Sequence, residues 1–272
     1  MPAPAAGELS VMSFNLRYAA ARDGHPWNRR LPVMAELIAR ESPTVIGTQE
    51  GLFDQLGSLL ARLPARYQWT GDGRLGGNDG EFAAVIFDST RLTASGADNF
   101  WLSRTPDVPG SKDWHSSLPR MATRVTFETP DAGRFTFVNT HFDHRSAEAR
   151  RQSAMLLRRR ADAEDCPVIM TGDFNADAGS DEYALLTGHP SPLVDAWPRA
   201  RRIVGSDVGT FHGYRGPVPG GPHIDWLLTT TDVSVAAAGV NTFQVDGDYP
   251  SDHFPLQAVV GLPGRGRDGP LD

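Results

Sequence analysis

Polar side chains flank the apolar, strand-like runs of this sequence in a regular way. Four of them follow the C-terminal end of a run: Asn15, Glu50, His141 and Asp173. Four others precede the N-terminal end of a run: Glu81, Asp225, Asp252 and His253. If the second group of strands runs antiparallel to the first, all of these side chains reach the same rim of the core. Convergence of side chains from separate strands is typical of a functional site.

Strand-like and helix-like segments alternate along the chain, which predicts an α/β fold. The apolar runs predict strands at residues 9–14, 44–48, 82–87, 120–127, 134–140, 168–171, 224–228 and 254–260. Helical spacing predicts helices from about residue 28, over 52–63, and after an N-cap at Ser146. Residues 101–119 are polar and rich in Pro and Gly, so we expect a long loop there, of the kind that is usually functional or disordered. Because no repeat or linker divides the sequence, we expect one domain over residues 9–262, with flexible termini at 1–8 and 263–272.

Composition removes several classes of protein. The chain has 26 Lys and Arg against 33 Asp and Glu, and the resulting net charge of −7 disfavours binding to nucleic acid by neutralisation of many phosphates. Lys112 is the only lysine and lies outside any phosphate-binding Gly-x-x-x-x-Gly-Lys loop. The single cysteine, Cys166, excludes an internal disulfide and a zinc site made of several cysteines. Since the sequence has no leader and no apolar run of membrane length, we expect a soluble cytoplasmic protein without a membrane partner.

The polar residues at the expected rim suit metal-assisted hydrolysis of a phosphate ester. A hard divalent cation needs carboxylate oxygens, and Glu50 is the first candidate ligand. Asp173 together with Asn175 could aim and deprotonate the attacking water. Charge that builds on the nonbridging oxygens needs fixed donors, which His141, Asn15 and His253 can supply. A carboxylate next to His253 would favour its imidazolium form.

Six motifs in a fixed order resemble the endonuclease/exonuclease/phosphatase superfamily over roughly residues 9–262. They are Phe14-Asn15, Gln49-Glu50, His141-Phe142-Asp143-His144, Thr171-Gly172-Asp173-Phe174-Asn175-Ala176, Ile224-Asp225 and Ser251-Asp252-His253-Phe254-Pro255. The resemblance implies a four-layer α/β/β/α sandwich of two mixed sheets flanked by helices, with phosphoesterase chemistry that depends on Mg²⁺ or, as an alternative, Mn²⁺.

The same resemblance implies a role for each residue of the expected site. The residues implied at the metal are Glu50, Asn15 and Asp252. The residues implied to be catalytic are His141, Asp173, Asn175, Asp225 and His253. Asp225 and Glu81 are implied as the partners that orient the two histidines. Several nucleases of the superfamily have an acidic ligand where this chain has Arg17, so a phosphate-binding cation could replace that ligand.

Further motifs around residues 101–120 and 210–213 resemble a bacterial branch that includes maltose-phosphate phosphatase-like enzymes. This branch points to a small phosphorylated substrate such as a sugar phosphate, hydrolysed by in-line attack of water without a covalent intermediate. The residues we expect to hold such a substrate are Arg17, Lys112, Arg120, His144 and His212. His223 stands where the superfamily often has Arg, and its role is left open.

Three other functions compete with this hypothesis. A nuclease would use the same chemistry on phosphodiesters, and a basic groove flanking His141 and His253 would favour it. A lipid phosphodiesterase is disfavoured because the sequence has neither a leader nor an apolar hairpin for a membrane. A non-catalytic binding protein on the same fold is disfavoured because every acid, amide and imidazole that the chemistry needs is present. The sequence points to no protein partner.

Overall fold

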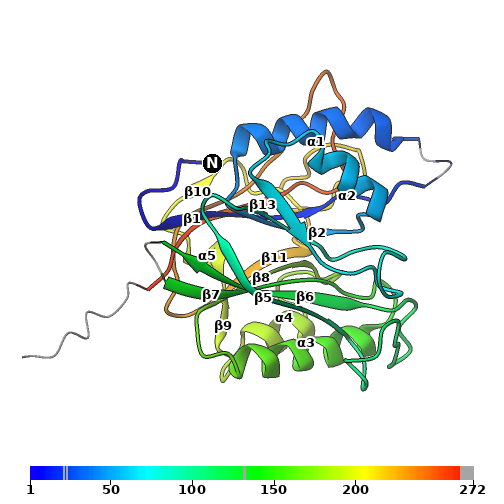
Figure 1. Cartoon of the computed structure of the whole chain (residues 1–272), viewed down its shortest axis with the longest axis vertical. Helices are drawn as coiled ribbons and strands as arrows, with labels where there is room; N and C mark the ends of the chain where they lie inside the picture. Colours follow the sequence, from blue (N-terminus) through cyan, green and yellow to red (C-terminus); the bar gives the residue numbers. More distant parts are fainter. Residues whose placement is uncertain (21, 23, 131–132, 264–272) are drawn as a thin grey trace, which may run out of the picture.

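Two mixed β-sheets lie face to face between layers of helices (Figure 1). The computed structural model describes residues 1–20, 22, 24–130 and 133–263. The seven-stranded sheet contains, in spatial order, β10 (Ile203–Val204), β12 (Ser234–Val240), β13 (Leu256–Gly261), β1 (Glu8–Asn15), β2 (Val45–Gln49), β4 (Val85–Asp88) and β3 (Tyr67–Thr70). The six-stranded sheet contains β5 (Thr93–Trp101), β6 (Met121–Thr129), β7 (Gly133–His141), β8 (Val168–Asp173), β11 (Asp225–Thr230) and β9 (Leu193–Asp195).

On the outer faces of the two sheets lie α1 (Trp27–Glu41), α2 (Phe53–Leu60), α3 (Ala147–Asp162) and α4 (Asp181–Thr187) (Figure 1). The single turn α5 (Ala196–Arg199) lies between the sheets. One apolar cluster joins α1 and α2 to the seven-stranded sheet, and another joins α3 and α4 to the six-stranded sheet. A third cluster fills the space between the sheets. The predicted four-layer α/β/β/α sandwich is therefore confirmed.

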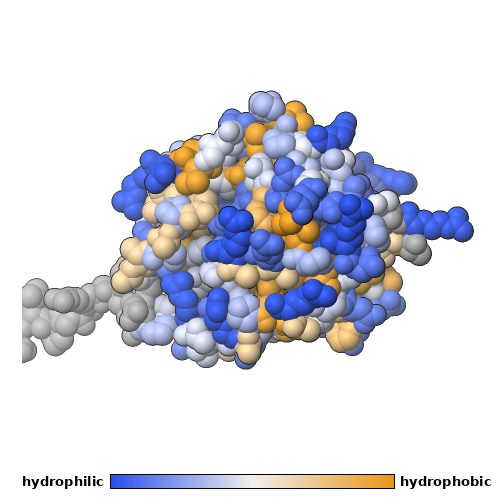
Figure 2. All heavy atoms as spheres, turned by 90° about the horizontal axis from the view of Figure 1, so that it is seen from above, coloured by the Kyte–Doolittle hydropathy of each residue, from blue (hydrophilic) through white to orange (hydrophobic). Residues whose placement is uncertain are grey.

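The outer surface over α1 and α2 follows from the amphipathic pattern of these helices. Leu31, Met34 and Ile38 of α1 are buried against the sheet, whereas Pro32 and Glu36 face water. Figure 2, which views the molecule from this side, shows a largely hydrophilic surface with small hydrophobic areas between polar side chains.

Strand direction brings the polar residues of the sequence to one rim. The strands β1 and β2 are parallel, as are β7 and β8, so their C-terminal ends meet in pairs. By contrast, β4, β11 and β13 run antiparallel to their neighbours β2, β8 and β1. In the six-stranded sheet, Asp173 stands directly opposite both His141 and Asp225. The predicted convergence of the polar side chains depends on these antiparallel strands, and the arrangement is confirmed.

A network of buried hydrogen bonds connects the two sheets beneath this rim. The Asn139 amide on β7 donates to the carbonyl oxygens of Thr48 (2.7 Å) and Ala84 (3.0 Å) in the other sheet. Its side-chain oxygen accepts from Gln49 (2.7 Å) and from Thr171 (3.0 Å). The sheets approach so closely here that position 47 of β2 is glycine: a Cβ would lie 2.0 Å from the Thr171 hydroxyl oxygen. The network sets the spacing between the two halves of the rim.

Several elements differ from the sequence expectations. The predicted long loop is confirmed for residues 102–120, which contain no helix or strand. The strand before it, β5, was not predicted, because six of its nine residues are exposed and show no apolar alternation. The N-terminal ammonium of Met1 lies 2.7 Å from Glu41, and the flexibility expected for residues 1–8 stays a prediction. The flexible tail expected at 263–272 falls almost wholly on residues 264–272, which lie outside the described residues.

None of the helices in the described part of the chain has the length and apolar character that a membrane span requires.

Candidate active site

A cavity of about 740 Å³ opens at the rim where the strand ends converge. Glu50 comes from the end of β2, His141 and Asp173 come from the ends of β7 and β8, and His253 precedes β13. The other predicted site residues that line it are Arg17, Glu81, Arg120, His144, Asn175 and Asp252. Both sheets therefore contribute to one cleft.

Asn15 links the acidic residues of the two sheets from beneath the cleft. Its side chain is fully buried, and its amide nitrogen lies 3.1 Å from Glu50 Oε1 and 3.0 Å from Asp173 Oδ2. The backbone N–H of Arg17 donates to the Asn15 side-chain oxygen (2.8 Å), which leaves the amide N–H groups for the carboxylates. Glu50 has a left-handed backbone (φ 64°), an uncommon conformation that turns its side chain into the cleft.

The donor set suits a divalent cation. Ligand atoms of Glu50, His141 and Asp173 all lie within 4.8 Å of one another, and so do ligand atoms of Asp173, Asp225 and His253. Burial, together with the nearby Asp225 and Glu50 carboxylates, raises the pKa of Asp173 to about 7. A raised pKa means that the charged carboxylates are unfavourable in this site, and a nearby cation would stabilise their charge. Oxygen-rich ligands of this kind fit Mg²⁺ or Mn²⁺.

His141 is held in its neutral form. Burial lowers its pKa well below the usual value, and the positive charge of Arg120 acts in the same direction. Its Nε2 atom lies 3.1 Å from the Asn175 amide nitrogen and 3.5 Å from Asp173 Oδ2. Asn175 also donates to the carbonyl oxygen of Phe142 (3.1 Å), from a left-handed backbone (φ 49°). An amide that donates to Nε2 requires the imidazole proton to sit on Nδ1.

His253 has the opposite charge state. Burial alone would lower its pKa, but the Asp225 carboxylate, 2.9 Å from Nδ1, outweighs this effect and the pKa rises to about 10. The other ring nitrogen, Nε2, lies 3.8 Å from Asp173 Oδ2 and faces the cleft. The two cleft histidines therefore offer one neutral imidazole and one imidazolium.

Two cations that line the cleft, Arg17 and Arg120, lie against other charged or titratable groups. Arg17 Nη1 lies 2.6 Å from Asp252 Oδ2, so the guanidinium contacts the carboxylate that the resemblance implies at the metal. Arg120 is buried, which lowers its pKa, and its Nη2 atom lies 3.0 Å from His144 Nδ1. Burial and Arg120 lower the pKa of His144 as well.

Glu81 contacts an arginine that the sequence analysis missed. Its carboxylate lies 2.7 Å from Arg74 Nη1, and burial raises its pKa. Glu81 and His141 line the same small cavity, so the orienting role of Glu81 stays a prediction. Arg74 itself also lines the main cleft. It lies in a glycine-rich loop without periodicity, and the nearby Glu81 was the only signal that could have pointed to it.

Two predicted substrate-binding residues lie elsewhere. Lys112 lines a separate pocket, beside the long loop. His212 is buried with its ring stacked 3.8 Å from that of Phe254, and burial lowers its pKa to about 4. Its neighbour Phe211, which the sequence analysis did not single out, lines the cleft with its ring 4.9 Å from that of His253. His223 pairs with Asp207 (3.0 Å) outside the cleft.

Residues 12–253 match the family model described as the Endonuclease/Exonuclease/phosphatase family. The chain belongs to this family. Members of the Endonuclease/Exonuclease/phosphatase family act on phosphate esters, so the cleft is that of a phosphoesterase. No curated protein matches the sequence.

Solved structures of the Endonuclease/Exonuclease/phosphatase family superimpose over nearly the whole chain. One is an endonuclease/exonuclease/phosphatase from Bacteroides vulgatus, with 32% identity, a TM-score of 0.88, and coverage of 94% of this chain and 99% of that one. Another is a mannosyl-6-phosphatase from Bacteroides thetaiotaomicron, with 32% identity, a TM-score of 0.87, and coverage of 93% and 100%. The D. rerio TDP2 complexed with a single-strand DNA product has 15% identity and a TM-score of 0.74 over 94% and 99% of the chains, and shares the fold.

Proposed function

We propose that this chain is a Mg²⁺-dependent phosphatase that acts on a small phosphorylated metabolite, most of all a sugar phosphate. The observation that carries the proposal is the cleft that joins Glu50 and Asn15 of one sheet to His141, Asp173 and Asp225 of the other. Similarity to a mannosyl-6-phosphatase at 32% identity over 93% of the chain supports a sugar phosphate as substrate.

Glu50 is the residue that would hold the metal, with Asn15 fixing its carboxylate and Asp252 nearby. When bound, Mg²⁺ would supply Lewis-acid stabilisation of the charge on the phosphate oxygens. Mn²⁺ has similar preferences for oxygen ligands and is the alternative.

The chain's own residues prepare the water and the phosphate. The Asp173 carboxylate, whose pKa is raised towards neutrality, takes the proton of the attacking water, and the neighbouring Asn175 amide orients that water. The protonated Nε2 of His253 donates to a nonbridging oxygen, on which charge increases as the bond to the leaving group breaks. Since the described residues that line the cleft include no Ser or Cys, water attacks phosphorus directly and no covalent intermediate forms.

The charge distribution around the cleft favours a small substrate over a polymer. Arg17 and Arg74 are each paired with a carboxylate, so neither extends a positive surface away from the cleft. Arg120 and His144, together with the exposed Arg145, are left to hold the phosphate. A net charge of −7 would also repel a long nucleic acid beyond its reacting phosphate.

The test is release of inorganic phosphate from hexose 6-phosphates, hexose 1-phosphates and nucleotides, with and without Mg²⁺, beside cleavage of single- and double-stranded DNA and RNA. We expect Mg²⁺-dependent release from at least one hexose phosphate. Asp173→Asn should lower kcat by about 10²–10⁴-fold, whereas Asp232→Asn, in an exposed turn, serves as the matched control. Cleavage of nucleic acid without release from any monoester would favour a nuclease. No activity on any of them would favour a binding protein.

A further inference from the structure

Asp143 is a buried carboxylate that connects the long loop to the phosphate-binding side of the cleft. It lies two residues after His141 and directly before His144, and only 1% of its surface is exposed. Asp143 is not among the residues that line the cleft, and the proposed reaction does not use it. An anion near a phosphate site repels the substrate. Its place in the structure therefore needs a reason other than contact with the phosphate.

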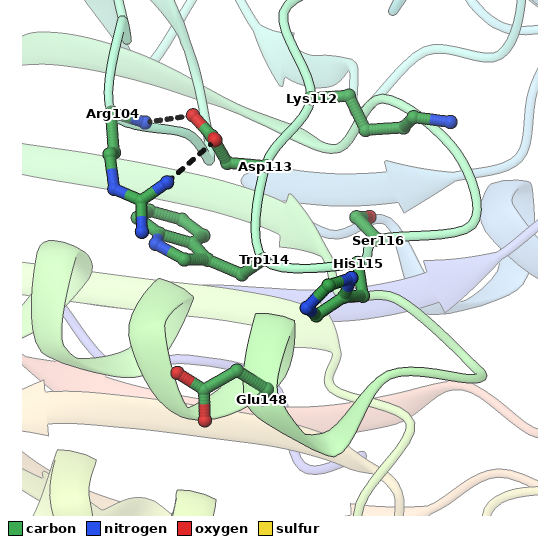
Figure 3. A pocket seen from close by; sticks show the side chains of 7 residues that line it. All are labelled: Arg104, Lys112, Asp113, Trp114, His115, Ser116 and Glu148. Carbon is green, nitrogen blue, oxygen red and sulfur yellow. Dashed lines mark hydrogen bonds and ion pairs between the residues drawn. The ribbon is translucent and has the colours of Figure 1, made fainter.

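One oxygen of Asp143 holds the end of the long loop. Oδ2 accepts from the Ser117 hydroxyl (2.5 Å) and from the backbone N–H groups of Ser117 (2.9 Å) and Leu118 (3.4 Å). Figure 3 shows the preceding residues, 113 to 116, beside the first turn of α3. Leu118 lines the cleft, and so does Arg120, two residues further along the chain. Oδ2 thus determines where the loop reaches the cleft.

The other oxygen of Asp143 holds the start of α3. Oδ1 accepts from the backbone N–H groups of Arg145 (3.0 Å) and Ser146 (2.8 Å), and Ser146 is the N-cap of the helix. Burial alone would raise the pKa of Asp143. The hydrogen bonds from Ser117, Ser146 and Arg145 have the larger combined effect, so the pKa lies well below its usual value. Asp143 is therefore a carboxylate anion, with both oxygens acting as acceptors.

The same carboxylate stabilises the charge of Arg120 without accepting a hydrogen bond from it. Oδ2 of Asp143 lies 3.8 Å from Arg120 Nε, which is close enough for charge attraction but too far for a hydrogen bond. This buried Nε atom has no hydrogen-bond acceptor among the described residues, and Nη2 lies 3.0 Å from His144 Nδ1. A buried guanidinium without a nearby anion would be costly. Asp143 reduces this cost and leaves the N–H at Nε for an anionic ligand.

We propose that Asp143 is a positioning residue that sets the place of Arg120 relative to His144 and Arg145, and through these cations the affinity of the cleft for phosphate. Its two oxygens join the two chain segments that carry the cations, so neither segment moves without the other. The inference rests on the proposed function for the assignment of these three cations to the phosphate. It adds a residue that governs substrate binding without contact with the substrate.

The first experiment measures KM and kcat for the best phosphate ester, and the Kd of inorganic phosphate by calorimetry, all with MgCl₂. Asp143→Asn has an amino group in place of one oxygen, so one of its two sets of N–H donors loses its acceptor. We expect KM and Kd to rise about tenfold, with kcat changed by less than about twofold, because the loss is in binding common to substrate and transition state.

Asp113→Asn is the matched control. Asp113 belongs to the same loop and also accepts from a backbone N–H and a guanidinium, both of Arg104 (2.9 and 3.0 Å), but it does not line the cleft. We expect this variant to leave KM and Kd unchanged, since its contacts lie within the loop.

Two further variants separate positioning from a loss of fold. Ser117→Ala removes one donor to Oδ2 and keeps the backbone contacts, so we expect KM to rise about threefold in a protein that still melts cooperatively. If Asp143→Asn does not melt cooperatively, Ser117→Ala decides the test. In a His144→Ala background, Asp143→Asn should raise KM by only about threefold, because a residue that acts partly through His144 loses that part of its effect.

The outcomes distinguish this inference from the proposed function. Phosphate binding that Asp143→Asn weakens, in a protein that hydrolyses no sugar phosphate, would support the inference and reject the proposed function. Hydrolysis of sugar phosphates with KM and Kd unchanged in Asp143→Asn and in Ser117→Ala would overturn the inference alone. Equal effects of Asp113→Asn and Asp143→Asn, or the full effect of Asp143→Asn in the His144→Ala background, would overturn it as well. A wild type that neither binds phosphate nor hydrolyses any ester would overturn both.

Discussion

The charge of His253 depends on one carboxylate. Asp225 is buried and lies 2.9 Å from His253 Nδ1, and its neighbour in the sheet is Asp173. Without this partner, burial would favour the neutral imidazole, and the cleft would lose a charged donor.

Asp225→Asn keeps the shape of the side chain and removes its charge. We expect kcat to fall by about 10²-fold at neutral pH, because His253 loses its proton and its fixed orientation. Steady-state kinetics on the best phosphate ester provides the measurement, with Asp232→Asn as the control on the exposed surface. Unchanged kcat would mean that His253 does not act as a charged donor.

Thr210 positions both partners of this pair. Its hydroxyl oxygen accepts from the backbone N–H groups of Ile224 and Asp225 (both 3.1 Å), and its carbonyl oxygen accepts from the N–H of Phe254 (2.7 Å). This buried threonine thus connects the residues on either side of the His253–Asp225 contact.

Thr210→Val has nearly the same shape but leaves two buried N–H groups without an acceptor. We expect a loss of about 2 kcal/mol in the free energy of unfolding and about a tenfold fall in kcat, with little change in KM. Thr210→Ser retains the oxygen and should restore most of both quantities. Denaturant titration and kinetics measure them, and equal behaviour of the Val and Ser variants would contradict the positioning role.

At the scale of elements, the two sheets approach closely at Gly47 of β2. A Cβ at this position would lie 2.0 Å from Thr171 Oγ1 and 2.4 Å from Asn139 Oδ1. We expect Gly47→Ala to destabilise the protein by about 3 kcal/mol, because the network between the sheets must shift. Gly57 of α2, where a Cβ meets no atom within 4 Å, is the matched control. Gly57→Ala should stabilise by about 0.5–1 kcal/mol, and equal effects at both positions would contradict this account.

An ion pair fastens the end of α3 to the six-stranded sheet. Glu164, just after α3, accepts from Arg124 of β6 through two bonds (2.6 and 2.7 Å) and from the Thr136 hydroxyl of β7 (2.7 Å). Burial alone would raise the pKa of Glu164. The hydrogen bonds from Arg124 and Thr136 have the larger combined effect, so the pKa lies below its usual value. A lowered pKa means that the contribution to stability is full above the unfolded-state pKa, about 4.3, and is lost as pH falls through the folded-state pKa.

Glu164→Gln therefore tests a pH-dependent contact. We expect the variant to be less stable than the wild type by about 1 kcal/mol at pH 7, with the difference shrinking as pH falls below about 4.3. Urea titrations between pH 3 and 7 measure it. Glu128→Gln, at an exposed position of β6, is the control. A difference that does not change with pH would show that the charge of Glu164 contributes nothing.

For the whole molecule, metal binding should be visible as stability. Glu50 and Asp173 belong to different sheets, so a cation held by Glu50 would also attract the Asp173 carboxylate across the rim. At about 100 times its Kd, Mg²⁺ would add about 2.7 kcal/mol, which raises Tm by about 5 °C in a protein of this size. Thermal melts with EDTA and with MgCl₂ provide the measurement. In Glu50→Gln the shift should largely disappear, and a wild-type Tm that does not respond to Mg²⁺ would argue against a metal at this site.

The sequence was most informative where function and hydrophobic pattern coincide. The strands that end in Asn15, His141 and Asp173 are buried on both faces, so their apolar runs and the polar residues after them stood out. The exposed strand β5 had no such pattern, and the surface loops that carry Arg74 and Lys112 have no periodicity from which their path could be inferred. For this reason the centre of the cleft could be predicted, whereas the outer contacts, which decide the substrate, could not.

The position of β13 between β12 and β1 has a consequence for synthesis of the protein. The ribosome makes β13 after every other strand of that sheet, so a nascent chain exposes two unpaired edges in the middle of the sheet until residue 261 has emerged. Until β13 inserts, the residues just before it, Asp252 and His253, are not held at the rim. We expect the growing polypeptide to be inactive, and prone to aggregate, until β13 has been synthesised and has inserted.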